Sequence, residues 1–302
     1  MSGRVVAVTG GNGFIGRALV PLLRLAGHTV RTIGRAGSSD YRWDPVAGSL
    51  DAAALDGVDA VVHLAGASIA VRWTDRVRRE IVASRTLGTR LIADAFSASA
   101  GAAAASRVLV SASAVGFYGD RGDELLDETS SSGDGFLADV VRQWESAAEP
   151  ARAAGIRTVH PRMGVVLSPA GGALQRLLVP FRLGVGGRIG AGNQWMSWVS
   201  LDDAVRAIAF ALDDGALRGA VNVVAPAPVT NAEFAAALAR VLSRPAFLPV
   251  PAVALRAMFG EMADETLLAS QRARPARLLA EGFRFAHPTL VEALQFELGR
   301  AA

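Results

Sequence analysis

The stretch "VVAVTGGNGFIGRALVPLLRLAG", residues 5–27, decides the fold of this 302-residue chain. Its apolar run at 5–10 predicts a strand, and the amphipathic pattern at 14–26 predicts a helix. The glycines at the join, Gly10, Gly13 and Gly16, follow the spacing G-x-x-G-x-x-G. There the first glycine makes the tight turn, the second lets a pyrophosphate approach the backbone, and the third lets helix and strand pack closely. The stretch therefore predicts a dinucleotide site at a helix N-terminus.

The end of the second predicted strand, residues 29–34, indicates which dinucleotide is bound. Proteins that use NAD usually carry Asp or Glu there, about 20 residues further on, to hold the ribose 2′-hydroxyl. This chain has Gly34 and Arg35 instead, followed by Ser38 and Ser39. A guanidinium can pair with a 2′-phosphate, which a carboxylate would repel. We therefore predict NADP(H) in preference to NAD(H), with a solvated surface charge as the alternative for Arg35.

The rest of the chain continues the alternation of strands and helices. Further strands are predicted at 60–66, 107–113 and 157–162, and further helices at 74–97 and 135–154, the last one kinked or shortened by Pro150. This rhythm is typical of an α/β fold with a Rossmann-type doubly wound parallel sheet. Beyond residue 165 come a glycine-rich loop, a helix at 202–214, a strand at 220–226 and short helices punctuated by proline. We predict a dinucleotide-binding domain at 1–165, with later returns to it possible, and a smaller α/β substrate lobe at 166–302.

Composition narrows the function. The chain has no cysteine and four dispersed histidines, so neither thiol chemistry nor a metal site is expected. All 31 basic residues are arginine, which raises the sequence pI to about 10.3 although the net charge is only +3. The arginines are scattered, and no apolar run approaches the ~20 residues that span a bilayer. We expect a cytoplasmic protein that binds neither nucleic acid nor membrane.

Several motifs carry a family resemblance. The stretches "TGGNGFIG", "VVHLAG" and "VLVSASAVGFYG" resemble the extended short-chain dehydrogenase/reductase superfamily, which includes nucleotide-sugar epimerases. The stretches "EIVASR", "FLADVVRQWE", "PFRLGVGGRIGAGNQWMSWVSLDDA" and "FGEMA" are similar to an atypical branch. Its members are called NAD-dependent epimerase family proteins with a C-terminal domain of unknown function. The likeness covers essentially the whole chain.

The resemblance implies a set of cofactor contacts that runs from the pyrophosphate to the nicotinamide. The implied residues are Thr9, Gly10, Gly13, Phe14, Ile15 and Gly16 at the pyrophosphate, Gly34 and Arg35 at the adenosine ribose, Leu64, Ala65 and Gly66 along the cofactor, Glu80 and Arg85 on the following helix, and Val166 at the nicotinamide end. Arg85 stands where extended members usually carry asparagine and could reach a phosphate or the loop behind the nicotinamide. Glu80 reads equally well as part of an exposed charged helix face.

The superfamily's proton donor has no counterpart. Hydride transfer at a carbonyl needs a matched proton donor or acceptor, which relatives supply with a Tyr-x-x-x-Lys pair. Here Phe136 and Val140 occupy those two places, and the chain has no lysine at all. We expect both residues to lie on the buried face of their helix, and we expect Asp134 to cap its start.

Two hydroxyl groups remain as catalytic candidates. Ser113 matches the superfamily's serine and could hydrogen-bond a substrate oxygen or merely cap the strand end. Tyr118 is the plausible phenolic acid, or else a structural turn aromatic. More distant candidates are the loop acids Asp120, Glu124, Asp127 and Glu128, which otherwise are only solvated, and His160.

The substrate and the reaction stay open. Gln194 and Trp198 match the region where relatives bind the distal part of the substrate, and a wall of this kind suits a small apolar or ring-containing molecule. Alternatively, this is an ordinary loop that its tryptophans anchor in the core. We expect an NADP(H)-dependent oxidoreductase or sugar-epimerase-like enzyme with a non-standard acid. The alternative is a non-catalytic NADP(H)-binding sensor or regulator. The resemblance implies a monomer, or a homodimer through the helices at 74–97 and 135–154.

Overall fold

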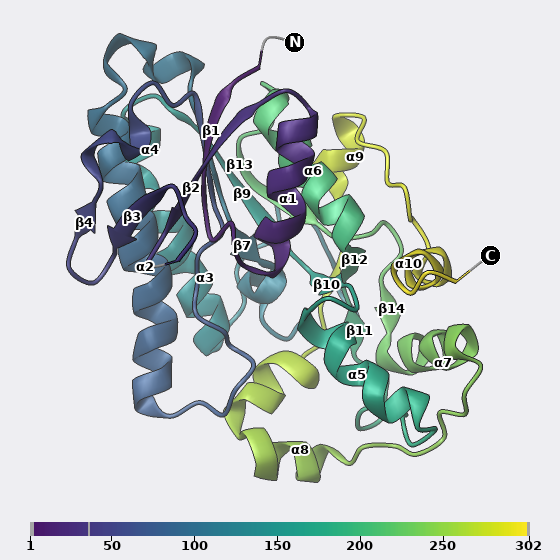
Figure 1. The fold of residues 1–302 in the computed structure, drawn as a ribbon. Helices are drawn as coiled ribbons and strands as arrows, with labels where there is room; N and C mark the ends of the chain where they lie inside the picture. The colour runs from purple at the N-terminus through teal and green to yellow at the C-terminus, as the bar shows by residue number, and fades with distance from the viewer. Residues whose placement is uncertain (1–2, 36, 301–302) are drawn as a thin grey trace.

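A nine-stranded sheet forms the centre of the structure, a computed structural model that describes residues 3–35 and 37–300 (Figure 1). In spatial order its strands are β13 (Gly219–Val223), β9 (Arg157–Met163), β6 (Val108–Ser111), β5 (Ala60–His63), β1 (Val5–Thr9), β2 (Thr29–Gly34), β3 (Tyr41–Asp44) and β4 (Ser49–Leu50), with β7 (Ser113–Ala114) paired to β9. Every pairing is parallel except that of β3 with β4.

The order of the strands reverses beside β1. The chain runs outward from β1 to β2 and β3, then crosses back to β5 on the other side of β1. In open parallel sheets ligands bind at such a switch point, outside the carboxyl ends of the strands. The predicted doubly wound α/β sheet is confirmed, and Gly10 lies at its switch point.

Helices cover both faces of the sheet (Figure 1). One face packs α1 (Phe14–Leu25) and α6 (Leu201–Asp213), and the other packs α2 (Asp75–Ala98), α3 (Phe136–Ser146) and α4 (Glu149–Ala153). Val6 and Val8 contribute to the first core, whereas Ala7 and Val61 contribute to the second. Because both faces are buried, the strands read as unbroken apolar runs.

The helix predicted at 135–154 is divided into α3 and α4. Pro150 lies in the first turn of α4, where its missing N–H costs nothing. The expected cap on α3 is wrong, because Gly135 rather than Asp134 is the N-cap residue and no side chain of its own caps the helix. Glu265 does so from a distance, since its carboxylate accepts from the backbone N–H groups of Phe136 and Leu137, both at 2.8 Å.

The second half of the chain builds a smaller lobe at the carboxyl edge of the sheet. Its core includes Leu174, Trp198, Phe234 and Leu294. Its elements are β10 (Val165–Leu167), α5 (Gly172–Arg182), β11 (Trp195–Met196), β12 (Trp198–Ser200), β14 (Val229–Thr230), α7 (Asn231–Leu242), α8 (Ala252–Phe259), the π-helix η4 (Ala263–Leu267), β15 (Arg272–Ala273), α9 (Ala276–Ala280) and α10 (Leu290–Glu297). The remaining elements are β8 (Leu125–Leu126), which pairs with β15, and the 3-10 helices η1 (Ala52–Leu55), η2 (Gly101–Ser106) and η3 (Val115–Tyr118).

The two halves of the chain share the central sheet. The strand β13 returns to it beside β9, and α6 packs against α1. The sheet therefore includes a strand beyond residue 165. The sequence had left such a later return of the chain to the first domain possible. Among the described residues no helix is long and apolar enough to cross a bilayer.

Candidate functional site

The glycine turn after β1 has the geometry that its spacing predicts. Gly10 has φ +69°, and the Gly13 N–H donates to the Gly10 carbonyl at 2.8 Å. A Cβ at Gly10 would lie 2.9 Å from the Ala65 nitrogen, and a Cβ at Gly16 would collide with the Gly10 carbonyl oxygen. Both positions therefore require glycine for the fold itself.

The start of α1 is open to an anion. Gly13 is the N-cap residue, with no side-chain cap, and no acid lies in the first turn. A Cβ at Gly13 would meet only the Gly10 carbonyl oxygen, at 3.0 Å, so little protein stands over the turn. Backbone N–H groups of a first helical turn that lack such partners suit a phosphate. The residues present fit a pyrophosphate here.

Thr9 holds the loop after β5 against β1. Its side chain is fully buried, and its Oγ1 accepts from the N–H groups of Leu64 at 3.2 Å and Ala65 at 3.4 Å. The same oxygen lies 2.7 Å from Nδ1 of His63. Burial lowers the pKa of His63 to about 4, so the imidazole is neutral near pH 7. Thr9 thus positions Leu64 and Ala65.

The start of α1 also meets the β10–α5 connection. A Cβ at Gly171 would lie 2.5 Å from the ring of Phe14, so this ring packs directly on that backbone. Ile15 and Val166 both pack on the core shared by α1 and α6. The fold brings these three predicted residues together at the carboxyl edge of the sheet.

An exposed arginine, Arg35, directly follows the end of β2. Arg35 follows Gly34, is exposed, and has no ion-pair partner within residues 3–35 and 37–300. Asn12 in the glycine turn donates to Ser39 at 3.4 Å, so the segment after β2 lies next to the turn. The nearby Asp40 carboxylate accepts from the N–H and the hydroxyl of Thr32, at 2.7 and 2.9 Å.

Arg85 points from α2 to the loop after β5. Its guanidinium donates to the carbonyls of Ile81 and Ala67, both at 3.1 Å, and lies 5.0 Å from the ring centre of Trp144. Burial lowers the pKa of Arg85 to about 10, so it stays charged at neutral pH. Among the described residues no carboxylate pairs with it.

Glu80 lies elsewhere on α2. It is exposed, and five helical residues correspond to a rotation of roughly 140° away from Arg85. Its placement agrees with the exposed charged helix face that was the alternative.

Ser113 is tied to a residue that the motifs did not reveal. Its hydroxyl donates to Oε1 of Glu145 at 2.6 Å, and Glu145 forms a two-pronged ion pair with Arg162 at 2.8 and 2.9 Å. Burial alone would raise the pKa of Glu145, but Arg162 outweighs it and holds the pKa below its usual range. The carboxylate is therefore ionised, and the Ser113 proton points to it.

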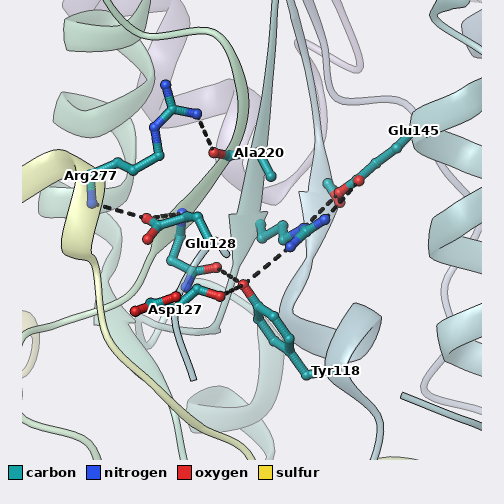
Figure 2. Close-up of polar contacts among 9 residues, drawn as sticks. Tyr118, Asp127, Glu128, Glu145, Ala220 and Arg277 are labelled. Carbon is teal, nitrogen blue, oxygen red and sulfur yellow. Dashed lines mark hydrogen bonds and ion pairs between the residues drawn. The ribbon is translucent and has the colours of Figure 1, made fainter. Parts of the chain in front are cut away.

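The Tyr118 hydroxyl lies inside a buried polar chain (Figure 2). Its single proton faces two acceptors, Oδ1 of Asn222 at 2.8 Å and the Asp127 carbonyl at 3.0 Å, and its oxygen accepts from Arg162 at 3.2 Å. The side chain is fully buried, which raises the pKa of the phenol. The proton and one acceptor position of this oxygen both have protein partners, so the geometry favours the structural alternative for Tyr118.

The same chain continues into the C-terminal lobe (Figure 2). The Glu128 carboxylate accepts from the N–H groups of Asn222 at 2.9 Å and Arg277 at 3.3 Å, and the Arg277 guanidinium donates to the Ala220 carbonyl at 2.9 Å. Polar contacts thus run from Glu145 on α3 to Arg277 on α9.

The two residues at the places of the missing pair differ in their surroundings. Val140 is buried, as expected. Phe136 is only half-buried, so the expectation of a core position was wrong for this residue. Its ring centre lies 5.1 Å from that of Trp73 and 4.5 Å from the guanidinium of Arg78, because the loop before α2 folds over the start of α3.

The predicted substrate wall faces inward. Trp198 is fully buried, and its indole N–H donates to the Ala227 carbonyl at 3.0 Å. The Gln194 amide donates to the carbonyls of Ile189 at 3.3 Å and Leu267 at 3.0 Å. Their placement agrees with the alternative that these side chains anchor the loop, because both pack within the lobe.

Sequence reasoning missed Glu145, Arg162 and Glu265. A signal existed for Arg162, since a charged residue in a buried strand needs a partner. Glu145 and Glu265 look like ordinary surface acids of helices, and only the packing of distant segments reveals their roles.

Comparisons with known proteins cover the whole chain. A family model described as the NAD dependent epimerase/dehydratase family matches residues 6–224, and a domain of unknown function, DUF1731, matches residues 250–297. An epimerase family protein of Mycobacterium tuberculosis is 48% identical over 304 residues, which cover 99% of each chain.

Solved structures share the fold. The human epimerase family protein SDR39U1, solved with NADPH, has a TM-score of 0.87 at 35% identity, over 98% of this chain and 100% of that one. A nucleoside-diphosphate sugar epimerase from Corynebacterium glutamicum has a TM-score of 0.81 at 38% identity, over 99% of this chain but 59% of that one. The Thermus thermophilus UDP-glucose 4-epimerase, solved with NAD, is 19% identical at a TM-score of 0.72 and indicates the fold alone.

Proposed function

The chain belongs to the NAD dependent epimerase/dehydratase family, and we propose that it binds NADP(H) and acts in hydride transfer on a small-molecule substrate. The observation that carries the proposal is the open glycine turn, Gly10 to Gly16, beside the unpaired Arg35. When bound, the cofactor would supply or accept the hydride. The protein would bind it, orient it and handle the proton.

The choice of NADP(H) rests on charge. Arg35 is free to pair with a 2′-phosphate, and the Asp40 carboxylate is already engaged by Thr32. The human relative solved with NADPH is similar over the full length. Arg85 adds a second cation, half-buried beside the loop that follows β5, and a phosphate or ribose oxygen would balance its charge.

For the proton, we propose Ser113 with Glu145 behind it. Because the Ser113 hydroxyl donates to Glu145, its oxygen can accept but not donate toward a ligand, which suits a substrate hydroxyl. The low pKa of Glu145 makes it a weak proton acceptor at neutral pH, so transfer by this route would be slow.

The second candidate is a non-catalytic NADP(H)-binding sensor or regulator. It is favoured by Phe136 and Val140, which cannot move a proton, and by the fully engaged Tyr118 hydroxyl. Cofactor binding needs none of these three side chains.

Cofactor binding is tested by thermal unfolding with NADPH, NADP, NADH and NAD. The melting temperature should rise most with NADPH and NADP. Arg35→Asp should abolish that preference, whereas Arg24→Asp, an exposed arginine at the far end of α1, should keep it. Equal shifts by NADH and NADPH would reject the NADP(H) assignment, and no shift with any of the four would reject dinucleotide binding.

Hydride transfer is tested separately with NADPH labelled at the nicotinamide C4 and a panel of carbonyl substrates, and with NADP and alcohols labelled at the carbinol carbon. Stereospecific loss of label that falls at least tenfold in Ser113→Ala, with NADPH binding retained, supports the enzyme. Tight NADPH binding with no label loss across the panel supports the sensor.

A further inference from the structure

Two segments of the C-terminal lobe carry arginines without acids. Residues 171–200 and 234–260 contain six arginines and no aspartate or glutamate, whereas the rest of the chain has three more acids than bases. The six are Arg176, Arg182, Arg188, Arg240, Arg244 and Arg256. Within the described part of the chain, only Arg256 forms an ion pair, with Asp264.

The two segments lie side by side. The Val250 N–H donates to the Arg188 carbonyl at 2.8 Å, and the Gly190 N–H donates to the Val250 carbonyl at 2.9 Å. The Arg244 guanidinium donates to the Arg182 carbonyl at 3.1 Å. Arg182, Arg188 and Arg244 therefore lie close together on one part of the surface, whereas Arg176 donates to the Ala70 carbonyl on another side.

Large apolar side chains stand out from the same surface. Leu183 is 73% exposed, and Phe247 and Val253 are each 72% exposed. Val179, Val185, Leu248 and Met258 are exposed as well, each by at least 45%. In Figure 1, α8 and the chain that leads to it from α7 form the lower edge of the molecule, with α5 beside them. We call residues 179–188 and 244–258 the basic apolar edge.

We propose that the basic apolar edge binds the surface of an anionic phospholipid bilayer. Exposed leucine, phenylalanine and valine side chains would enter the boundary between headgroups and acyl chains, and the unpaired arginines would meet the lipid phosphates. Peripheral binding needs no spanning helix, so the sequence's lack of one, which led us to expect no membrane contact, does not oppose it.

The charge of this edge argues against other occupants. In a symmetric dimer built on it, the arginines of one copy would face those of the other. The protruding apolar side chains are also a poor match for a nucleic-acid backbone, which binds through charge alone. A bilayer with anionic headgroups supplies both the phosphates and the apolar layer that the edge lacks.

The test is sedimentation of the full chain with vesicles of phosphatidylcholine alone and of phosphatidylcholine mixed with phosphatidylglycerol. Binding is expected only to the mixed vesicles, and it should weaken as salt rises. The triple variant Arg182→Gln, Arg188→Gln, Arg244→Gln should bind about tenfold or more weakly. Phe247→Ser with Val253→Ser should also weaken binding, with less effect on its salt dependence.

The matched control is Arg24→Gln with Leu25→Ser at the end of α1, where Leu25 is 90% exposed but stands alone. It should bind vesicles like the wild type. Equal binding to both vesicle types, no binding to either, or equal loss in the control would overturn the proposal. So would salt-sensitive binding of polyglutamate without vesicle binding, which indicates an acidic protein partner, or a dimer that the arginine triple variant dissociates.

Discussion

Glu265 in η4 accepts a hydrogen bond at 2.8 Å from the backbone N–H of Phe136, 129 residues earlier in the chain. The second carboxylate oxygen accepts from Leu137, so one side chain satisfies two N–H groups at the positive end of α3. The start of α3 is also where relatives place the tyrosine of their proton-donating pair. The C-terminal lobe thus fixes the helix on which the missing chemistry would have stood.

Removal of this cap should loosen α3. Glu265→Ala is expected to lower the free energy of unfolding by about 1–2 kcal/mol and to speed hydrogen exchange at the Phe136 and Leu137 amides. Asp264→Ala, which removes the exposed ion pair with Arg256 beside Glu265, is the control and should leave that exchange unchanged. Unchanged exchange in Glu265→Ala would show that the cap does not hold the helix.

The Glu145 carboxylate balances a buried cation. Glu145→Ala leaves the Arg162 charge without a partner and should cost roughly 3–5 kcal/mol in urea unfolding. Glu149→Ala, which breaks the exposed pair with Arg152 nearby, is expected to have almost no effect.

Glu145 should also shape stability in acid. Because its pKa is lowered in the fold, its stabilisation is present above the unfolded value near 4.5 and is lost as the pH falls through the folded pKa. Glu145→Gln should therefore lose less stability in acid than the wild type. An equal loss of stability in acid would mean that the contribution of the Glu145–Arg162 pair does not depend on the charge of Glu145.

The Tyr118 hydroxyl should matter for stability and not for cofactor binding. Tyr118→Phe leaves Asn222 and Arg162 short of a partner inside the protein, at a cost of about 1–3 kcal/mol. NADPH affinity is expected to stay unchanged. Tyr41→Phe, at the chain's other tyrosine, should be nearly neutral. A stable Tyr118→Phe variant that loses hydride transfer would instead make this hydroxyl catalytic.

His63 should make stability fall in mild acid. Burial lowers its folded pKa to about 4 from 6.5, so below pH 6.5 the unfolded chain takes up the proton first. Its contribution is complete above pH 6.5 and should fall by roughly 3 kcal/mol as the pH drops to about 4. In His63→Asn, chemical unfolding across this range should show a shallower slope. Part of the slope should remain in this variant, because burial also lowers the pKa of His160.

Gly16 is the most tightly packed glycine of the turn, and a methyl group at this position should not be tolerated. Gly16→Ala places a Cβ against the Gly10 carbonyl and 2.7 Å from the Gly11 Cα. The strand and the helix must separate, so both stability and NADPH binding should drop. Gly215→Ala, where a Cβ meets nothing within 4 Å, is the matched control and should change neither. Wild-type NADPH binding in Gly16→Ala would show that the turn does not form the cofactor site.

The sequence determined the parallel sheet with its covering helices and the glycine turn. These follow from local patterns, namely apolar runs, helical periodicity and three glycines at fixed spacing. It also determined that no Tyr-Lys pair exists, because the chain contains no lysine.

Only the tertiary structure decided which polar groups meet across long stretches of the chain. Glu145 with Ser113, Glu265 with Phe136, and Tyr118 with Asn222 are 32, 129 and 104 residues apart. No local sequence pattern predicts contacts between residues so far apart in the chain. A hydrogen bond requires two groups to be close in space, but it sets no requirement on the number of residues between them. For the same reason Trp198 and Gln194 matched a substrate-binding stretch in sequence, yet their side chains point into the lobe.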